Sequence, residues 1–377
     1  MKKILTLALL FCFVVAEDEF FEEGVNIGGY GEMHYTNSVD PDSDDDPTTK
    51  LDFHRWILFV NYNFTSEWSL KSELEIEHNM IGGSYGGYVE LEQAYVNYHN
   101  AAGWGYGAGT MLISSGIINE THEPPTFLSV ERPSYNSKVI PTTWFGNGAM
   151  VYGSFGDIHA KFVLHEDMHG DGMVSLTTDE NGAVTSGKFS GLRGGRAKGY
   201  KSTAYHWTKN MSMHWTGMEG VNVGGSYTFG GAPTGFGDVH EDYVAWNLME
   251  FHGQYDANNV VAAFEYGMVN FSHEAANTAG VDGGNVKLDD QAANGYYFHL
   301  GYNVASMMGW EDCKLVPWFG MENYDLNDLD DSDAIAHTKM GVTWWPTDKV
   351  SFKMDYDMKD DNDSKTNTLS MGVGYMF

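Results

Sequence analysis

The residues best suited to chemistry are acidic side chains that recur at every second position between residues 71 and 92. In KSELEIEH (71–78) the charged residues hold the odd positions, while His78 shares the even positions with serine and aliphatic residues. Glu90 and Glu92 repeat this pattern in the next segment. Successive side chains of a strand point to opposite faces, so the charged residues share one face and His78 lies on the other. A confined row of carboxylates selects which ions dwell beside it.

The preceding segment indicates which face points where. Apolar side chains hold the even positions from Trp56 to Phe64, which places Arg55 on the other face. A charge facing lipid near the bilayer midplane costs about 2–4 kcal/mol, so the charged face must line an aqueous interior. Two interpretations stay open: the carboxylates bias the ions that pass, or Arg55 and Lys71 pair with them and stiffen the wall. The residues predicted to line the pore are Arg55, Lys71, Glu73, Glu75, Glu77, Glu90 and Glu92.

A long segment from about 115 to 143 carries both prolines and apolar residues. Its four prolines stiffen it without helix or ladder hydrogen bonds. Exposure of its isoleucines, Phe127 and Leu128 to water would be unfavourable, so we expect the segment to fold back into a barrel and narrow it. The alternative is an external loop that packs against a neighbouring subunit. The residues predicted to form the constriction are Glu120, His122, Glu123, Glu131, Arg132 and Lys138.

The motif HEDMH (165–169) has the H-E-x-x-H spacing of zinc proteases. That chemistry requires a helix, on which residues four apart share a face and bind one zinc ion. Here the preceding residues have strand character and Gly170-Asp171-Gly172 predicts a turn. In a strand the two histidines would lie about 13 Å apart. Weak surface binding of a transition metal is therefore a better interpretation than metalloprotease activity.

Aspartates gather in several predicted loops, near residues 42–46, 325–333 and 360–363. Their oxygens suit Ca²⁺ or bridges to lipopolysaccharide, but they lack the twelve-residue spacing of a calcium loop, and solvated loops are the simpler interpretation. A basic run at 193–201 is either an anion-attracting patch or a partner for these acidic loops. We expect no cofactor, with Ca²⁺ at the acidic loops as the candidate exception. The weak metal candidates are His165, His169, Asp328 and Asp330.

The elements that would position these residues are strands with period-two hydrophobicity. Short turns and long, often acidic loops alternate between them, as in bacterial outer-membrane barrels with an even strand count and both termini inside. About 22 residues per strand fits a barrel large enough for an aqueous channel. A soluble sandwich or propeller is disfavoured because no repeat of 40 to 50 residues appears. The sixteen predicted strands are 25–36, 53–64, 68–80, 86–99, 104–114, 144–155, 157–169, 203–215, 219–230, 240–255, 258–272, 292–304, 313–325, 334–346, 350–359 and 367–377.

Both ends of the chain agree with this architecture. Lys2 and Lys3 precede a short apolar run, and small residues up to Ala16 predict a signal peptide over residues 1–16, with the barrel over 17–377. The last residues, NTLSMGVGYMF (367–377), place large apolar side chains on one face and Ser370, Gly372 and Gly374 on the other. A final strand that ends on an aromatic residue is typical of outer-membrane barrels.

Composition excludes other classes. Loss of Lys2 and Lys3 with the signal peptide leaves 19 of the 21 basic residues against 52 acidic ones, so no nucleic-acid-binding surface is expected. Only Cys313 would remain, so no disulfide can form within one chain.

Tryptophans near strand ends, such as Trp104, Trp144, Trp344 and Trp345, are expected to form interfacial girdles.

Several segments together resemble the phosphate-selective porin family of trimeric outer-membrane channels: LDFHRWILFVNYNF (51–64), SELEIEH (72–78), VELEQAYVNY (89–98), GIINETHEPPTFLSVERP (116–133) and IPTTW (140–144). The resemblance implies a sixteen-stranded trimeric porin with inward-folded loops. Family members with phosphate selectivity line the pore with many arginines and lysines, whereas the wall identified here is rich in glutamate.

The expected function is passive transport, not enzymatic catalysis. We expect a bacterial outer-membrane porin with both termini on the periplasmic side. Because the predicted wall is rich in glutamate, we expect a weak preference for cations. Its expected partners are membrane lipid, lipopolysaccharide, two further copies of the chain, and small solutes and ions. The competing hypotheses are an anion or phosphate channel, an outer-membrane hydrolase and a structural surface protein.

Overall fold

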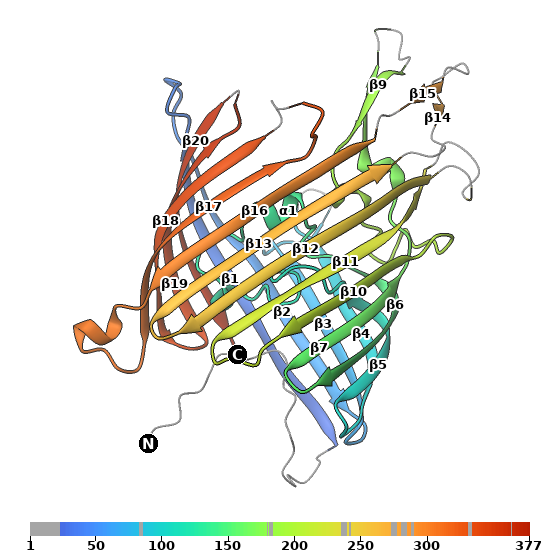
Figure 1. Ribbon diagram of the computed structural model, residues 1–377. Helices are drawn as coiled ribbons and strands as arrows, with labels where there is room; N and C mark the ends of the chain where they lie inside the picture. The colour runs from blue at the N-terminus through green and yellow to red at the C-terminus, as the bar shows by residue number, and fades with distance from the viewer. Residues whose placement is uncertain are drawn as a thin grey trace.

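The computed structural model describes residues 23–82, 86–178, 180, 184–234, 240, 243–272, 277–279, 285–287, 290–330, 334–362 and 364–377. Within these residues, sixteen antiparallel strands close into one tilted barrel (Figure 1). In order around the barrel they are β1 (Gly24–Val39), β2 (Thr48–Asn63), β3 (Trp68–Glu77), β4 (Val89–His99), β5 (Trp104–Leu112), β6 (Phe145–Phe155), β7 (Ile158–His165), β10 (Thr208–Trp215), β11 (Val221–Pro233), β12 (Tyr243–Ala257), β13 (Val260–Ser272), β16 (Gln291–Tyr302), β17 (Lys314–Asp325), β18 (Ile335–Thr347), β19 (Val350–Asp360) and β20 (Lys365–Met376).

The first and last strands close the barrel. β1 pairs with β20 along ten residues, and Gly29 and Phe377 exchange backbone hydrogen bonds of 3.1 and 2.9 Å. Closure removes the free sheet edge that would leave backbone groups without partners in lipid. The predicted sixteen-stranded antiparallel barrel is therefore confirmed, and each barrel strand overlaps one of the predicted segments. The predicted signal peptide lies outside the described residues.

The long connections contain short elements that the sequence did not predict. β8 (Val174–Thr178) pairs with β9 (Val184–Phe189), and β14 (Asn277–Ala279) pairs with β15 (Asn285–Lys287), so two predicted loops are hairpins. None of the helices in the described residues is long and apolar enough to cross a membrane. The short helices are η1 (Pro124–Thr126), α1 (Tyr135–Lys138), η2 (Gly170–Met173), η3 (Arg193–Gly195) and η4 (Ala305–Met308).

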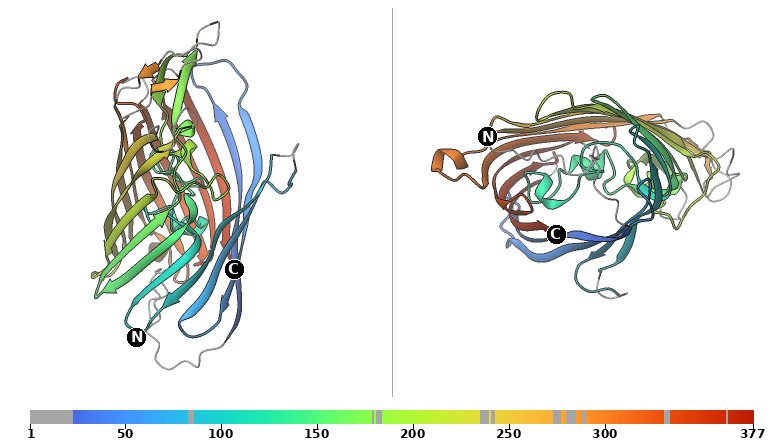
Figure 2. Two further views of the ribbon diagram at one scale, coloured as in Figure 1. Left: turned by 90° about the vertical axis from the view of Figure 1, so that its right-hand side faces the viewer. Right: turned by 90° about the horizontal axis from the view of Figure 1, so that it is seen from below.

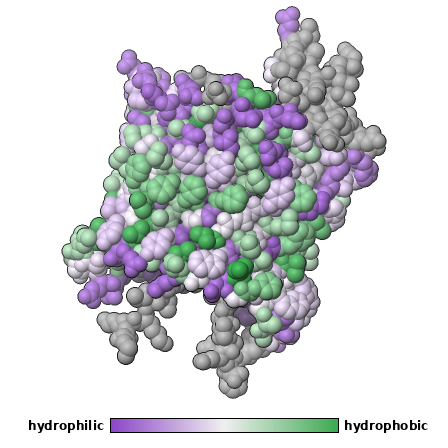
Figure 3. Space-filling view, viewed as in Figure 1, coloured by the Kyte–Doolittle hydropathy of each residue, from purple (hydrophilic) through white to green (hydrophobic). Residues whose placement is uncertain are grey.

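The outer surface carries a broad apolar zone beneath a hydrophilic rim (Figure 3). Trp68, Trp104 and Trp344 are exposed, as expected of a girdle. Trp144 and Trp345 contradict that expectation: Trp144 is buried against Trp246, and the Trp345 ring nitrogen donates to Pro125 O at 2.9 Å. Exposed apolar residues of the strands include Val60, Val96, Val151, Phe162, Met211, Phe251, Phe264, Leu300, Phe319, Met340 and Met354.

The largest apolar cluster of the described residues lies inside the barrel. The connection between β5 and β6, residues 113–144 and here called the insert, runs within the ring of strands (Figure 2). Its Tyr135 packs against Tyr297 of β16 with ring centroids 5.7 Å apart, and Trp144 packs against Trp246 of β12 at 5.8 Å. Phe189 of β9 stacks on Phe271 of β13 at 4.8 Å. The β12 to β16 side of the interior is therefore filled by apolar packing.

Candidate functional site

The insert has room beside β20 because that strand presents small residues to the interior. A Cβ atom added at Gly372 would lie 2.9 Å from Val130 Cγ1, and one added at Gly374 would lie 2.3 Å from Pro124 Cβ. Both contacts are closer than side chains tolerate. The small face of the last strand, visible in the sequence, thus makes room for the insert.

Acidic side chains of the wall hold the backbone of the insert. Asp355 of β19 accepts the Val130 N–H at 2.6 Å, and Glu265 of β13 accepts the Ile117 N–H at 2.8 Å. Glu322 of β17 accepts the Tyr135 N–H at 3.1 Å. Each bond satisfies a backbone donor that has no ladder partner. These carboxylates therefore position the insert.

On the opposite wall, a histidine of the insert lies between two of the predicted pore-lining glutamates. His122 Nε2 is 3.5 Å from Glu73 Oε1 and 3.6 Å from Glu92 Oε2. Thr143 and Gln93 donate further hydrogen bonds to these carboxylates, at 2.7 Å to Glu92 and 2.6 Å to Glu73. Burial alone would lower the pKa of His122, but the two carboxylates raise it to about 10. A charged imidazolium therefore clamps the insert to β3 and β4.

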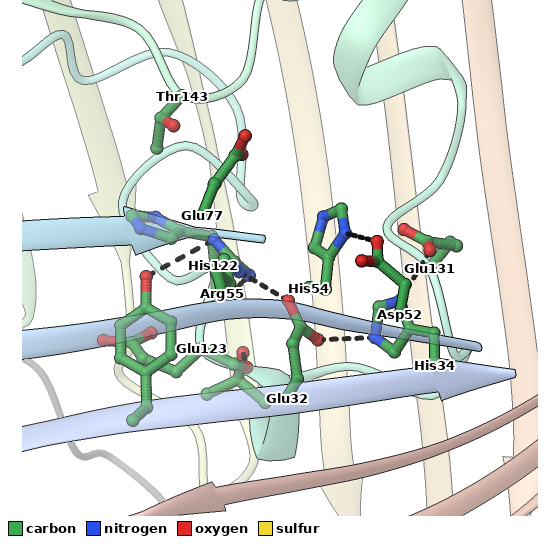
Figure 4. Close-up of polar contacts among 12 residues, drawn as sticks. Glu32, His34, Asp52, His54, Arg55, Glu77, His122, Glu123, Glu131 and Thr143 are labelled. Carbon is green, nitrogen blue, oxygen red and sulfur yellow. Dashed lines mark hydrogen bonds and ion pairs between the residues drawn. The ribbon is translucent and has the colours of Figure 1, made fainter. Parts of the chain in front are cut away.

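Arg55 supports this clamp from β2, with a different partner from the one predicted. Its Nε lies 2.5 Å from Glu32 Oε1 on β1, and its guanidinium also donates to the Tyr30 hydroxyl at 3.4 Å and to His122 O at 2.8 Å (Figure 4). Of the two interpretations left open, the one in which Arg55 pairs with the glutamates of β3 does not describe its ion pair, which is with Glu32. Arg55 lies directly across from Glu77 in the strand register, but Glu32 reaches it from the other side. Lys71 lies half-buried beside Tyr95.

The structure divides the predicted pore-lining acids into two groups. All of them belong to the inward face, but Glu73, Glu75 and Glu92 are buried, with residue exposures of 2%, 3% and 0%. Their assignment as pore-lining residues is corrected, because they are buried, and residues of the insert contact Glu73 and Glu92. The side chains of Glu77 and Glu90 are 15% and 18% exposed. These two can face a solvated path.

The predicted constriction residues also separate. His122 and Glu123 are buried, and burial raises the pKa of Glu123 to about 7. Glu120 pairs with Lys161 of β7 at 2.5 Å. The prediction is corrected for His122 and Glu123, which are buried and are not free eyelet groups, whereas the side chain of Glu120 is 22% exposed.

The other constriction candidates keep contact with solvent. The Glu131 carboxylate, half exposed, lies 2.6 Å from His34 Nδ1. Arg132 is half-buried and Lys138 is exposed. Glu131, Arg132 and Lys138 therefore keep solvent contact, as does the partly exposed Glu120.

The basic run at 193–201 lies against the insert and the acidic wall. Arg193 donates to Thr142 O at 2.7 Å, Arg196 donates to Thr143 O, and Lys198 pairs with Glu90. Burial and the nearby Arg132 lower the pKa of Arg193, while Glu77 and Glu90 oppose that shift. Basic side chains of this run and Arg132 of the insert therefore lie near glutamates of β3 and β4.

The H-E-x-x-H motif forms no helix. His165 ends β7, and His169 precedes η2 with its Nε2 2.5 Å from Lys201 O. Glu166 accepts the Gly199 N–H at 2.9 Å, and Asp167 accepts three backbone N–H groups of residues 205–207. The motif thus holds the connection between β7 and β10 in place. The geometry of a zinc protease is absent from these described residues.

Residues that could bind a metal lie elsewhere. Four groups of described residues place three suitable ligand atoms within 4.8 Å of one another, and none includes the weak candidates His165, His169, Asp328 or Asp330. Asp328 instead accepts the Ala292 N–H at 2.7 Å. Sequence reasoning missed the histidines of the first strands, His34 and His54, and placed His78 on the lipid face. Only the presence of histidine near the same end of three successive strands could have signalled them.

Comparison with known proteins shows the fold. No protein-family model matches the chain. It is 29% identical over 385 residues to an uncharacterized protein of Aquifex aeolicus, covering 94% of this chain and 80% of that protein.

Solved structures agree at low identity. The anion-selective porin from Comamonas acidovorans gives a TM-score of 0.59 at 11% identity, covering 94% of this chain and 100% of the porin. The outer-membrane channel DcaP of Acinetobacter baumannii gives 0.58 at 10% identity, covering 94% and 97%. The trimer form of OmpT, an outer membrane protein of Vibrio cholerae, gives 0.57 at 11% identity, covering 95% and 100%. The chain therefore has the fold of outer-membrane porins.

Proposed function

We propose that the protein is an outer-membrane porin, a passive diffusion channel for small hydrophilic solutes and ions. The observation that carries this proposal is the closed barrel with an apolar exterior and charged side chains on the inner wall of β1 to β4. Solutes would move down their own gradients, and no bond would be made or broken. The insert narrows the interior and leaves the charged wall as the side on which hydrated ions are stabilised.

The channel is weakly cation-preferring in this proposal. Glu77, Glu90 and Glu131 are among the acidic groups that retain solvent contact beside the insert. The competing specificity is for anions, including phosphate, and the cluster of Arg132, Arg193 and Arg196 favours it. The resemblance to phosphate-selective porins extends to the fold in this proposal, without the phosphate preference.

The remaining assignments complete the proposal. We place the protein in a bacterial outer membrane as a homotrimer, in contact with lipid and lipopolysaccharide. The short turns and both termini would face the periplasm, after removal of residues 1–16, and the acidic loops would face outward, where Ca²⁺ can bind. An outer-membrane hydrolase or a structural protein would have the same fold, but neither needs a charged wall that faces the lumen.

Planar-bilayer recording tests the proposal. Purified protein should give stepwise openings, in triplets if it is a trimer, whereas a sealed bilayer would contradict channel function. The reversal potential in a potassium chloride gradient then decides the sign of selectivity. Glu77→Gln combined with Glu90→Gln should move it toward anion preference, while Glu219→Gln in the exposed turn after β10 should not. An equal shift in both variants would refute the assigned path.

A further inference from the structure

We propose that Asp52, His54 and His78 form a binding site for a divalent transition-metal ion such as Zn²⁺, Co²⁺ or Ni²⁺. Asp52 and His54 lie on β2, and His78 follows the end of β3. Asp52 and His54 lie close to Glu131 of the insert (Figure 4). The site goes beyond the proposed diffusion function, because a metal can bind there whether or not the barrel conducts.

The ligand atoms already have nearly the spacing that a metal requires. Asp52 Oδ1 lies 2.9 Å from His78 Nδ1, and Asp52 Oδ2 lies 3.3 Å from His54 Nδ1. Each of the three residues offers a ligand atom within 4.8 Å of the other two. Around a tetrahedral ion with bonds of about 2.0–2.1 Å, ligand atoms lie roughly 3.3 Å apart. Small side-chain rotations therefore suffice for coordination.

The donor set specifies the class of ion. Two imidazoles and one carboxylate suit Zn²⁺, Ni²⁺, Co²⁺ and Cu²⁺, whereas Mg²⁺ and Ca²⁺ prefer sets made of oxygen alone. The side chains of Asp52, His54 and His78 are 13%, 22% and 31% exposed. A fourth coordination position is therefore open to water, as in zinc sites that exchange ligands.

Two backbone irregularities bring these side chains together. The register of β1 and β2 skips one residue, because Glu32 pairs with Arg55 and Met33 pairs with Phe53. His54 is the extra residue of this bulge, and bulges re-aim side chains. His78 has φ of 53°, a left-handed conformation that is costly for a residue other than glycine. It turns His78 away from the lipid face and toward Asp52.

The surroundings orient the ligands and favour a cation. His34 stacks on His54 with ring centroids 5.0 Å apart, and both of its nitrogens are engaged, by Glu131 at 2.6 Å and Glu32 at 3.0 Å. His34 is therefore a support for His54 and not the first choice as a ligand. Glu77 Oε2 lies 3.9 Å from His78 Nε2 and adds negative charge. Lys50, exposed and 2.9 Å from Asp52, is the cation that a metal would displace.

Co²⁺ titration of the full chain, purified in detergent, tests the site through visible absorption, with Zn²⁺ calorimetry as the second measurement. We expect one saturable site per chain. His54→Asn and His78→Asn should each weaken binding at least tenfold, while His159→Asn, whose ring contacts Ser154 near the short turns, should bind as the wild type does. No saturable site, or equal binding by all three variants, would overturn the proposal.

Lys50→Ala keeps all three ligands and removes an exposed side chain, so folding is not at risk. It should bind Co²⁺ more tightly, because Asp52 loses its competing partner. Unchanged or weaker binding would contradict the role of Asp52 as a ligand. The titration needs no membrane, so a channel that conducts but binds no Co²⁺ would refute this inference alone, and a barrel that binds Co²⁺ but does not conduct would refute only the proposed function.

Discussion

Replacing His122 by leucine should release the insert from the acidic wall. The imidazolium lies within 3.6 Å of the carboxylates of Glu73 and Glu92, which are 2% and 0% exposed. Leucine would leave both buried carboxylates without this cation, and breaking a buried ion pair by removing one partner costs about 3–5 kcal/mol. Arg55 cannot compensate, because it contacts the backbone oxygen of residue 122 and its charge is paired with Glu32.

A loss of that size should change the insert's behaviour measurably. Because each 1.4 kcal/mol is tenfold in population, the undocked state should become roughly a hundredfold to several thousandfold more populated. We expect larger and noisier single-channel currents, and faster trypsin cleavage after Lys138 of the insert. The two assays are independent, because currents are recorded in a bilayer whereas cleavage is measured on protein in detergent.

Two further variants make the test specific. His159→Leu removes a histidine whose ring contacts the neutral hydroxyls of Ser154 and Thr216, so it should leave both readouts unchanged. Adding Glu73→Gln to His122→Leu should restore part of the docking, because one uncompensated charge disappears. Wild-type currents together with wild-type cleavage in His122→Leu would refute the clamp.

Three other outcomes are expected. The pKa of His122 is about 10 in the docked insert against an ordinary value of 6.5, so its contribution to docking is complete below pH 6.5 and disappears as pH rises through 10; bilayer currents recorded from pH 7 to 11 should grow over the upper part of that range. Gly374→Val would collide with Pro124 and should destabilise the protein by about 1–3 kcal/mol in urea unfolding, whereas Gly24→Val, with no atom within 4 Å of an added Cβ, should not. Glu166→Ala removes acceptors of Gly199 and Ser202, so trypsin should cleave faster at Lys198 and Lys201 than in the wild type; an unchanged rate would contradict the anchoring role of the motif.

The barrel could be predicted because lipid imposes a simple rule on every strand. Side chains on one face must be apolar, and the other face is free to carry charge, so the alternation from Lys71 to Glu77 identified both the strand and its inward face. The closing strand was equally clear, because large apolar residues alternate with Ser370, Gly372 and Gly374 up to the aromatic Phe377. Local periodicity and turn lengths carry this information without knowledge of distant contacts.

The site depended on contacts that periodicity does not encode. His122 meets Glu73 and Glu92 across 49 and 30 positions of sequence, and only the path of the insert decides that pairing. His54 is displaced by a bulge, and His78 leaves its strand in a left-handed conformation. Each irregularity reverses or shifts the face that strict alternation assigns. Metal ligands therefore stood where the period-two rule predicted a lipid-facing residue.

The interior combines two environments, and their arrangement determines where ions can go. Apolar packing of the insert on β12, β13 and β16 removes water from that side, where a charge would lose its hydration. Partly exposed charges remain on the β1 to β4 side, among them Asp52, Glu77 and Glu90. If the barrel conducts, ions must therefore follow the charged wall, past the proposed metal ligands. A divalent ion bound at Asp52 would then change the potential that every permeating ion meets, which links selectivity and metal binding through one surface.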